Sequence, residues 1–283
     1  MQLDLPDAPV VCLDFWCRAG SAFEQVEESG MAHFLEHMVF KGSTHLAAGE
    51  FDRRIEALGG SSNAATGFDD VHFHVLIPPD GAAEALDLLL DLVLQPRLEG
   101  GDFAMERQVV LEELAQSEDQ PEEVAFQELL RQACPNHAYG LPILGRREAL
   151  EAHRPEAMAD FHRRHYRADR CCLSMAGPLQ GLGLSERLQG SALAELIPAS
   201  GESVVRPLSL HSGDTTLELA RLEAARLLMA WRLPAAADQD AVVGGDLLTT
   251  LLAEGRRSRL VERLREQLRL VESIDLDLNV LES

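Results

Sequence analysis

The chain has 283 residues, of which 46% are hydrophobic and 25% are charged, the balance of a folded globular protein rather than a disordered one. Its 25 Lys and Arg residues against 47 Asp and Glu residues give a net charge of −22. This charge argues against a nucleic-acid partner, which requires clustered cations, and it suits a cationic substrate or simple solubility. No apolar stretch approaches the ~20 residues of a membrane span and no export signal is visible, so we expect a cytoplasmic protein with no membrane partner.

In chain order, the predicted elements indicate an α+β fold with a mixed or antiparallel sheet packed against helices. Residues 10–17 are apolar and rich in β-formers, which is typical of a buried strand. The small, polar segment 61–66 follows two helices and precedes residues 71–77, which alternate apolar and polar side chains as a strand does. We expect helices at residues 30–40, 48–58, 81–94, 102–118, 121–134, 154–166 and 184–196, and a short strand at 171–176.

Beyond residue 197 the order of elements resembles a second, incomplete copy of the same architecture. The stretch 197–213 carries Pro, Gly and Ser and is the best linker candidate. A strand at 227–233, a helix at 241–265 and a final strand at 271–280 follow it. The sequence therefore predicts a first domain at residues 1–197, a linker at 198–213 and a partial second domain at 214–283.

The segment His33-Phe-Leu-Glu36-His37 is an H-x-x-E-H motif on a predicted helix. At about 100° per residue, the three polar side chains share one helix face. Two imidazoles one turn apart can bind a single Zn²⁺, and a carboxylate beside them can activate water, which is the inverted zincin pattern. The alternative is a surface helix with two histidines, which the otherwise apolar residues 30–40 disfavour.

A catalytic zinc site also requires a third protein ligand, and the predicted helix 102–118 offers two carboxylates. Glu106 and Glu113 are seven positions apart, so they differ by only about 20° in helix phase. Val109 and Val110 are expected on the same, core-facing side, and Glu112 is expected to point to solvent. Two carboxylates on a buried stripe require a positive partner, and a zinc ion is the obvious candidate.

The segments GMAHFLEHMVFKGSTHL, IEALGGSSNAATGFDDVHFHVLIP and ERQVVLEELAQSEDQP closely resemble the pitrilysin/insulinase family of zinc peptidases, in its mitochondrial processing peptidase-like branch. The resemblance implies that one Zn²⁺ per chain is bound by His33, His37 and Glu113. It further implies that Glu36 is the general base, that Glu106 is a catalytic carboxylate supporting the ligands, and that Asn63 and Ala64 border a peptide substrate added as a strand.

Some features depart from the family pattern. The family's usual first strand is expected to be missing or shortened, and the chain is expected to stop inside its second domain. Of the family's distal Arg/Tyr pair, which helps to hold the substrate carbonyl, only Arg265 is present, because Glu272 stands where Tyr is expected. A partner subunit can supply such residues, so we expect a homo-oligomer or a heterodimer with a related subunit.

These departures leave two hypotheses for the function. The first is an active zinc metalloendopeptidase, and the second is a non-catalytic or truncated relative that acts as the structural subunit of a heterodimer. Other candidate residues are interpreted structurally: His72 and His74 as one strand surface, His162 and His165 as a solvated helix face, and Cys171-Cys172 as core packing. The five cysteines include no C-x-x-C pair, so neither a disulfide scaffold nor a thiolate zinc site is indicated.

Overall fold

The computed structural model describes residues 1–198, 205–220, 222 and 224–283. Its centre is a mixed five-stranded sheet in the order β1-β5-β2-β4-β3, in which β1 and β5 run parallel and the other neighbours run antiparallel. The strands are β1 (Gln2–Asp4), β2 (Val11–Cys17), β3 (Ser61–Thr66), β4 (Val71–Ile77) and β5 (Cys171–Gly177). The first strand, β1, has only three residues.

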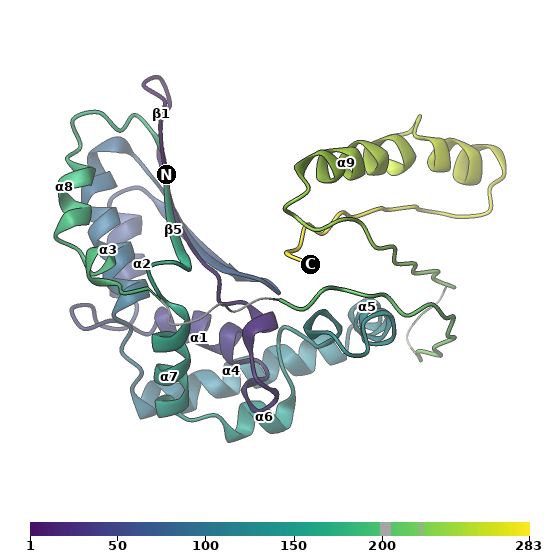
Figure 1. Ribbon diagram of the computed structural model, residues 1–283, viewed down its shortest axis with the longest axis horizontal. Helices are drawn as coiled ribbons and strands as arrows, with labels where there is room; N and C mark the ends of the chain where they lie inside the picture. The colour runs from purple at the N-terminus through teal and green to yellow at the C-terminus, as the bar shows by residue number, and fades with distance from the viewer. Residues whose placement is uncertain (199–204, 221, 223) are drawn as a thin grey trace.

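Helices pack on one face of this sheet and at its end (Figure 1). The α-helices are α1 (Met31–Val39), α2 (Glu50–Ala57), α3 (Ala82–Leu94), α4 (Gly100–Glu118), α5 (Pro121–Ala133), α6 (Arg147–Ala152), α7 (Pro155–His165), α8 (Leu184–Gln189) and α9 (Gln239–Ala253). The predicted helices up to residue 166 agree with these bounds to within about two residues. The predicted helix 184–196 is instead α8 followed by a 3₁₀ turn, Ala192–Glu195.

The core lies between the sheet and these helices because β2 and β4 bury every second side chain. Leu13 and Phe15 of β2 are completely buried, as is Val75 of β4, and they meet apolar side chains of α1 and α3. The intervening residues of both strands face away from the helices and are partly exposed. The α+β class and the mixed sheet predicted from the sequence are therefore confirmed.

One strand lies where the sequence predicted none. Residues 61–66 pair antiparallel with β4 as β3, the edge strand of the sheet. Because an edge strand is half exposed, it does not need the apolar alternation on which the prediction depended.

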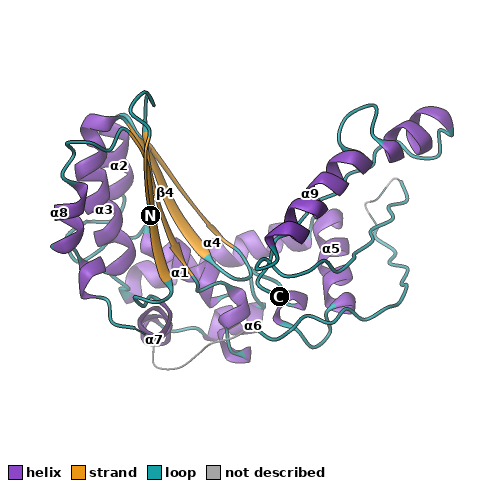
Figure 2. Cartoon of the chain, turned by 45° about the horizontal axis from the view of Figure 1, so that its top comes forward, coloured by secondary structure: helices purple, strands orange, loops and turns teal. Residues whose placement is uncertain are grey.

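The C-terminal region differs more from the expectation. The predicted strands 227–233 and 271–280 are extended segments outside the sheet, with Leu227 82% and Val280 50% exposed. An extended segment becomes a strand only through a hydrogen-bonded neighbour, and the described residues provide none here. The predicted helix 241–265 is split into α9 and a π-helical segment, Val261–Gln267, by a turn at Gly255. Together these segments form an arm beside the sheet domain (Figures 1 and 2).

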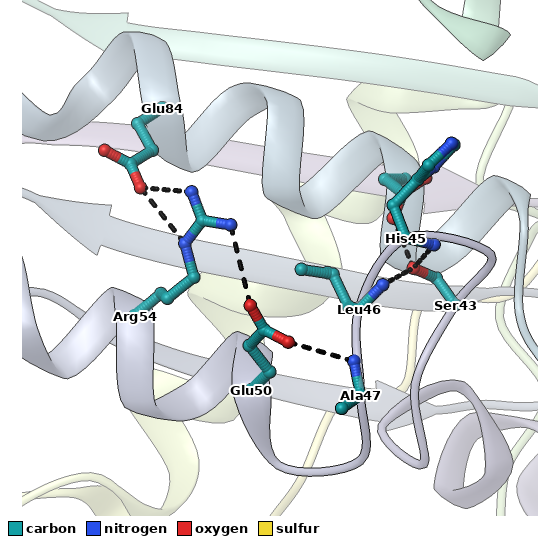
Figure 3. Close-up of polar contacts among 8 residues, drawn as sticks. Ser43, His45, Leu46, Ala47, Glu50, Arg54 and Glu84 are labelled. Carbon is teal, nitrogen blue, oxygen red and sulfur yellow. Dashed lines mark hydrogen bonds and ion pairs between the residues drawn. The ribbon is translucent and has the colours of Figure 1, made fainter.

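The loop that follows α1 is tied to α3 and to α2 by polar contacts (Figure 3). Ser43 Oγ accepts the N–H of Leu46 at 3.0 Å and donates to Asp91 of α3. Glu50 accepts the N–H of Ala47 at 3.1 Å, and Arg54 of α2 pairs with Glu84 of α3. These contacts hold α2 against α3 and fix the chain where it leaves α1.

No helix among the described residues combines the length and the hydropathy needed to cross a bilayer. Part of the predicted linker 198–213, residues 199–204, lies outside the described residues.

Candidate active site

Helix α1 carries the H-x-x-E-H motif and starts at a backbone position that only glycine suits. Gly30 has a φ of 85°, and a Cβ there would lie 2.7 Å from the Leu144 carbonyl oxygen. The Glu24 carboxyl accepts the N–H groups of Gly30 and Ala32, at 2.9 and 2.8 Å. These contacts satisfy two of the donors that the first turn of a helix leaves without partners. The residue before the motif and an upstream carboxyl therefore fix where α1 begins.

Helix α4 packs against α1 and presents its carboxylates to the motif. Phe34 of α1 and Phe103 of α4 are both buried, with ring centroids 4.5 Å apart. Glu106 is 6% exposed and Glu113 is half-buried, which agrees with the predicted stripe. Glu112 is exposed, as predicted.

The predicted burial of one residue on this stripe is wrong. Val110 is completely buried, but Val109 is 47% exposed. The two are neighbours, 100° apart on the helix, and the contact with α1 covers only the side of Val110.

Three of the predicted residues converge on one point. The ligand atoms of His33, His37 and Glu113 all lie within 4.8 Å of one another. Glu113 Oε2 is 3.6 Å from His33 Nε2 and 3.4 Å from His37 Nε2, too far for good hydrogen bonds. Ligands bound at about 2.1 Å to a tetrahedral ion lie about 3.4 Å apart. Both the donor set and its spacing therefore fit zinc.

The electrostatics of His33 also suit a metal ligand. Burial, and then the neighbouring His37, lower the pKa of His33 to about 4, so its imidazole is neutral near pH 7. Neutral imidazole is the form that binds zinc. The other ring nitrogen of His33, Nδ1, is buried and has no hydrogen-bond partner among the described residues. Among the described residues, the polar neighbour of this ring is thus the Glu113 carboxyl, which lies 3.6 Å from Nε2.

Glu106 lies behind the cluster, in contact with His37. Its Oε1 is 2.9 Å from His37 Nδ1, and its Oε2 is 2.6 Å from the ammonium of Lys41. A carboxylate on Nδ1 holds a proton there and leaves Nε2 as the lone-pair donor. Glu106 therefore selects the imidazole tautomer that can bind a metal, and Lys41 balances the charge of this buried carboxylate.

Glu36 shares the face of α1 with the two histidines. Its Oε2 accepts a hydrogen bond from Thr66 Oγ1, at the end of β3. Burial raises the pKa of the Glu36 carboxyl above its ordinary value, and the bond from Thr66 and the nearby His37 oppose that rise. A carboxyl whose pKa is raised toward neutrality is suited to accept and return a proton.

The predicted substrate residues occupy the outer strand of the sheet. Asn63 and Ala64 lie in β3, whose second edge carries no strand in the described part of the chain. Asn63 is exposed and Ala64 is half-buried. β3 is thus an edge strand among the described residues, and the role of Asn63 and Ala64 in binding substrate stays a prediction.

The last predicted site residue lies elsewhere. Arg265 is in the segment Val261–Gln267 on the arm, and its guanidinium pairs with the neighbouring Glu266 at 2.7 Å. Glu272 is exposed in the extended segment that follows. The described structure thus does not bring Arg265 to His33, His37 and Glu113, and its role also stays a prediction.

The other histidines take structural positions. His72 stacks on Trp16, with ring centroids 4.3 Å apart, and lies next to His74 on the outer sheet face, as predicted. The predicted solvated face of α7 is wrong: His162 Nε2 bonds the Val93 carbonyl at 2.9 Å, and His165 is only 5% exposed. Arg163 and Arg164 lie between the two histidines in the sequence and are exposed. These charged neighbours led to the prediction of a solvated face, although the histidines point to the buried side of the helix.

Sequence reasoning missed three residues that organise the site: Glu24, Lys41 and Thr66. Thr66 belongs to the Asn-Ala-x-Thr segment, so its position near the H-x-x-E-H motif could have been predicted from the sequence. Lys41 follows the C-terminal end of α1, outside the predicted helix 30–40, and no sequence pattern indicated its contact with Glu106. Glu24 lies in a loop, and no sequence pattern indicated its contact with Gly30.

Two family profiles match this chain. Residues 3–147 match the profile of insulinase, peptidase family M16, and residues 154–282 match that of the peptidase M16 inactive domain. The break between the two profiles falls before the predicted linker 198–213.

Curated relatives carry protease names. A protein of Rickettsia felis named "uncharacterized zinc protease" is 27% identical over 97% of this chain and 66% of its own length. A probable mitochondrial-processing peptidase subunit beta of Arabidopsis thaliana is 31% identical over 61% of this chain and 33% of its own length. The chain thus spans about two thirds of the first relative and a smaller part of the second.

Solved structures confirm the fold. A protease from Helicobacter pylori superposes with a TM-score of 0.83 at 23% identity, over 99% of this chain and 68% of that one. The profile matched by residues 3–147 covers the whole H-x-x-E-H motif together with Glu106 and Glu113 of α4. The chain therefore belongs to the insulinase family of peptidases, family M16.

Proposed function

We propose that this chain is a zinc metalloendopeptidase that hydrolyses peptides or precursor segments. The proposal depends on one observation: the ligand atoms of His33, His37 and Glu113 lie within 4.8 Å of one another. His33 and His37 share their face of α1 with Glu36, and Glu113 approaches that face from α4. Zinc protease is also the name given to several relatives of this chain.

The residues of the site divide the chemistry between them. Zinc, when bound by His33, His37 and Glu113, supplies Lewis-acid activation of water and of the scissile carbonyl. Glu36 takes the proton from the attacking water and passes it to the leaving amine. The hydrogen bond from Thr66 fixes one oxygen of Glu36, so the other oxygen can receive the proton. Glu106 keeps His37 in the metal-binding tautomer.

A Glu36→Gln variant tests this assignment. The amide keeps the size of the side chain but cannot accept the proton, so zinc content should be unchanged while cleavage of a fluorogenic peptide falls by about 100-fold or more. Glu27→Gln, an exposed position in the loop before α1, is the control and should match the wild type. Loss of zinc from Glu36→Gln would show that Glu36 is a ligand and contradict the role proposed here.

The second candidate function is that of a structural subunit. The match of residues 154–282 to the inactive-domain profile and the position of Arg265 on the arm favour it. A folded wild-type chain that takes up no zinc and cleaves no peptide, but raises the activity of a related subunit, would support this alternative.

We further propose that this chain associates through apolar side chains of the arm. Leu227, Trp231 and Leu247 are all more than 60% exposed there. Contiguous exposed apolar side chains favour association, so the proposed partner is a second copy or a related subunit. Size-exclusion chromatography with light scattering should show an oligomer, and replacing Leu227 and Trp231 with Ser should return the mass to that of one chain. A monomeric wild type would contradict this proposal.

A further inference from the structure

Cys17 and Cys171 lie face to face across two strands of the sheet. Cys17 ends β2, Cys171 begins β5, and the two residues are direct partners in the antiparallel register. The Cys171 thiol donates to the Cys17 sulfur, with the two Sγ atoms 3.5 Å apart. All five cysteines of the chain are free thiols in this structure. Two reduced sulfurs are therefore in contact at a site that the proposed catalytic function does not use.

The backbone around this pair suits a covalent link. The Arg18 N–H donates to the Arg170 carbonyl at 2.8 Å, which makes the adjoining pair, Cys17 and Cys171, the non-hydrogen-bonded kind. In such pairs the Cα atoms are about 4.5 Å apart, which lies within the range that a disulfide spans. Closing the remaining gap between the sulfurs requires side-chain rotation and no change of register.

The two sulfurs differ in their access to solvent. Cys17 is completely buried, its thiol lies 3.6 Å from the His165 carbonyl oxygen, and burial raises the pKa of that thiol well above its ordinary value. Cys171 is partly exposed. A small oxidant therefore reaches Cys171 first, and Cys17 is the thiol placed to react with the product.

We propose that Cys17 and Cys171 form a reversible, redox-controlled disulfide that staples β2 to β5. With hydrogen peroxide as the oxidant, Cys171 is oxidised to a sulfenic acid and one water is released. The Cys17 sulfur then attacks the Cys171 sulfur, the S–S bond forms, and the sulfenic oxygen leaves as a second water. Two thiols thus lose two electrons and two protons to one peroxide, and a dithiol reductant reverses the change.

The neighbouring cysteines provide an internal comparison. Cys172 is exposed on the other face of β5, opposite Trp16, and so reports that oxidant has reached the protein. Cys134 is buried at the C-terminal end of α5 and does not belong to either of the two strands that carry this pair. Peroxide should therefore link Cys17 to Cys171 while it oxidises Cys172 only to sulfur acids.

Tryptic peptides distinguish the possible links in the full-length chain. Cleavage at arginine places Cys12 and Cys17 in the peptide 1–18, and Cys171 and Cys172 in the peptide 171–187. The double variant Cys12→Ser, Cys172→Ser leaves one thiol in each peptide, so a linked pair identifies the bond without changing either proposed partner. Thiols are alkylated at acidic pH after peroxide treatment, before digestion and mass spectrometry.

The expected result is a peptide pair joined with the loss of two hydrogens, a count of alkylatable thiols lowered by two, and restoration of both thiols by dithiothreitol. The oxidised chain should run as a monomer on a non-reducing denaturing gel and unfold at a higher temperature than the reduced chain, because the link closes a long loop. The proposal would be overturned if Cys17 and Cys171 both stayed alkylatable at a peroxide dose that oxidises Cys172 in the wild type, or if the link were found only between chains.

Discussion

Glu106 Oε1 lies 2.9 Å from His37 Nδ1, while the opposite ring nitrogen of His37 faces Glu113 at 3.4 Å. The imidazole is thus held between two carboxylates of one helix, α4, which are two turns apart. In the proposed zinc site, Glu106 would set the tautomer of His37 and Glu113 would bind the metal beside it. This arrangement explains why both Glu106 and Glu113 lie toward α1.

Replacing Glu106 with Gln should weaken zinc binding without removing it. The neutral amide holds the Nδ1 proton of His37 less strongly, so the zinc dissociation constant should rise by about 10- to 100-fold. Competition with a fluorescent chelator measures this constant. Glu112→Gln, exposed on the same helix, should leave it unchanged. Equal zinc affinity in the Glu106 variant would show that the contact with His37 does not support the metal.

Removing the Glu24 carboxyl should destabilise the start of α1. Glu24→Ala leaves the N–H groups of Gly30 and Ala32 without their acceptor, which should lower the free energy of unfolding by about 1–2 kcal/mol. Glu24→Gln should lie between this variant and the wild type, because its amide offers one acceptor oxygen instead of two. Urea denaturation measures both, and Glu27→Ala is the exposed control. A Glu24→Ala chain as stable as that control would contradict the capping role.

Acid should destabilise the fold through His165. Burial, followed by Arg164 and Arg170, lowers the pKa of His165 to about 3 in the folded chain, against about 6.5 when unfolded. Between these values the unfolded chain binds the extra proton, so stability falls as the pH falls from about 6.5 toward 3. The contribution of this one residue between pH 7.5 and 5 is about 2 kcal/mol.

His165→Phe isolates that contribution, because phenylalanine fills the space beside Phe161 and cannot titrate. Urea denaturation at pH 7.5 and pH 5 should show the wild type losing about 2 kcal/mol more than this variant. The same comparison with His211→Phe, at an exposed position, is the control. An identical pH dependence in wild type and His165→Phe would show that folding does not shift the pKa of His165, and would contradict this account.

Much of the sheet domain was predictable because its signals are local. The apolar alternation of residues 71–77 and the helical spacing of His33, Glu36 and His37 each depend on a few neighbouring side chains. The seven-residue spacing of Glu106 and Glu113 likewise predicted one shared face of α4, and the structure brings Glu113 to the motif. Periodicity therefore predicted both helices that form the site.

What the sequence could not show depends on partners distant in the chain. Residues 61–66 are a strand only because β4 pairs with them, and residues 227–233 are not a strand because the described chain offers them no neighbour. The contact of Cys17 with Cys171 joins residues 154 positions apart. Such relationships depend on which strands become neighbours in the sheet, and the pattern within a single segment does not show that.

The zinc content of the purified chain, measured by mass spectrometry of the metal in parallel with His37→Ala, tests the central claim most directly. The account predicts about one Zn²⁺ per wild-type chain and almost none in His37→Ala, with both proteins folded by circular dichroism. The exposed control His211→Ala should retain the metal. Stoichiometric zinc in His37→Ala, or a folded wild-type chain that takes up no zinc, would contradict the site assigned to His33, His37 and Glu113.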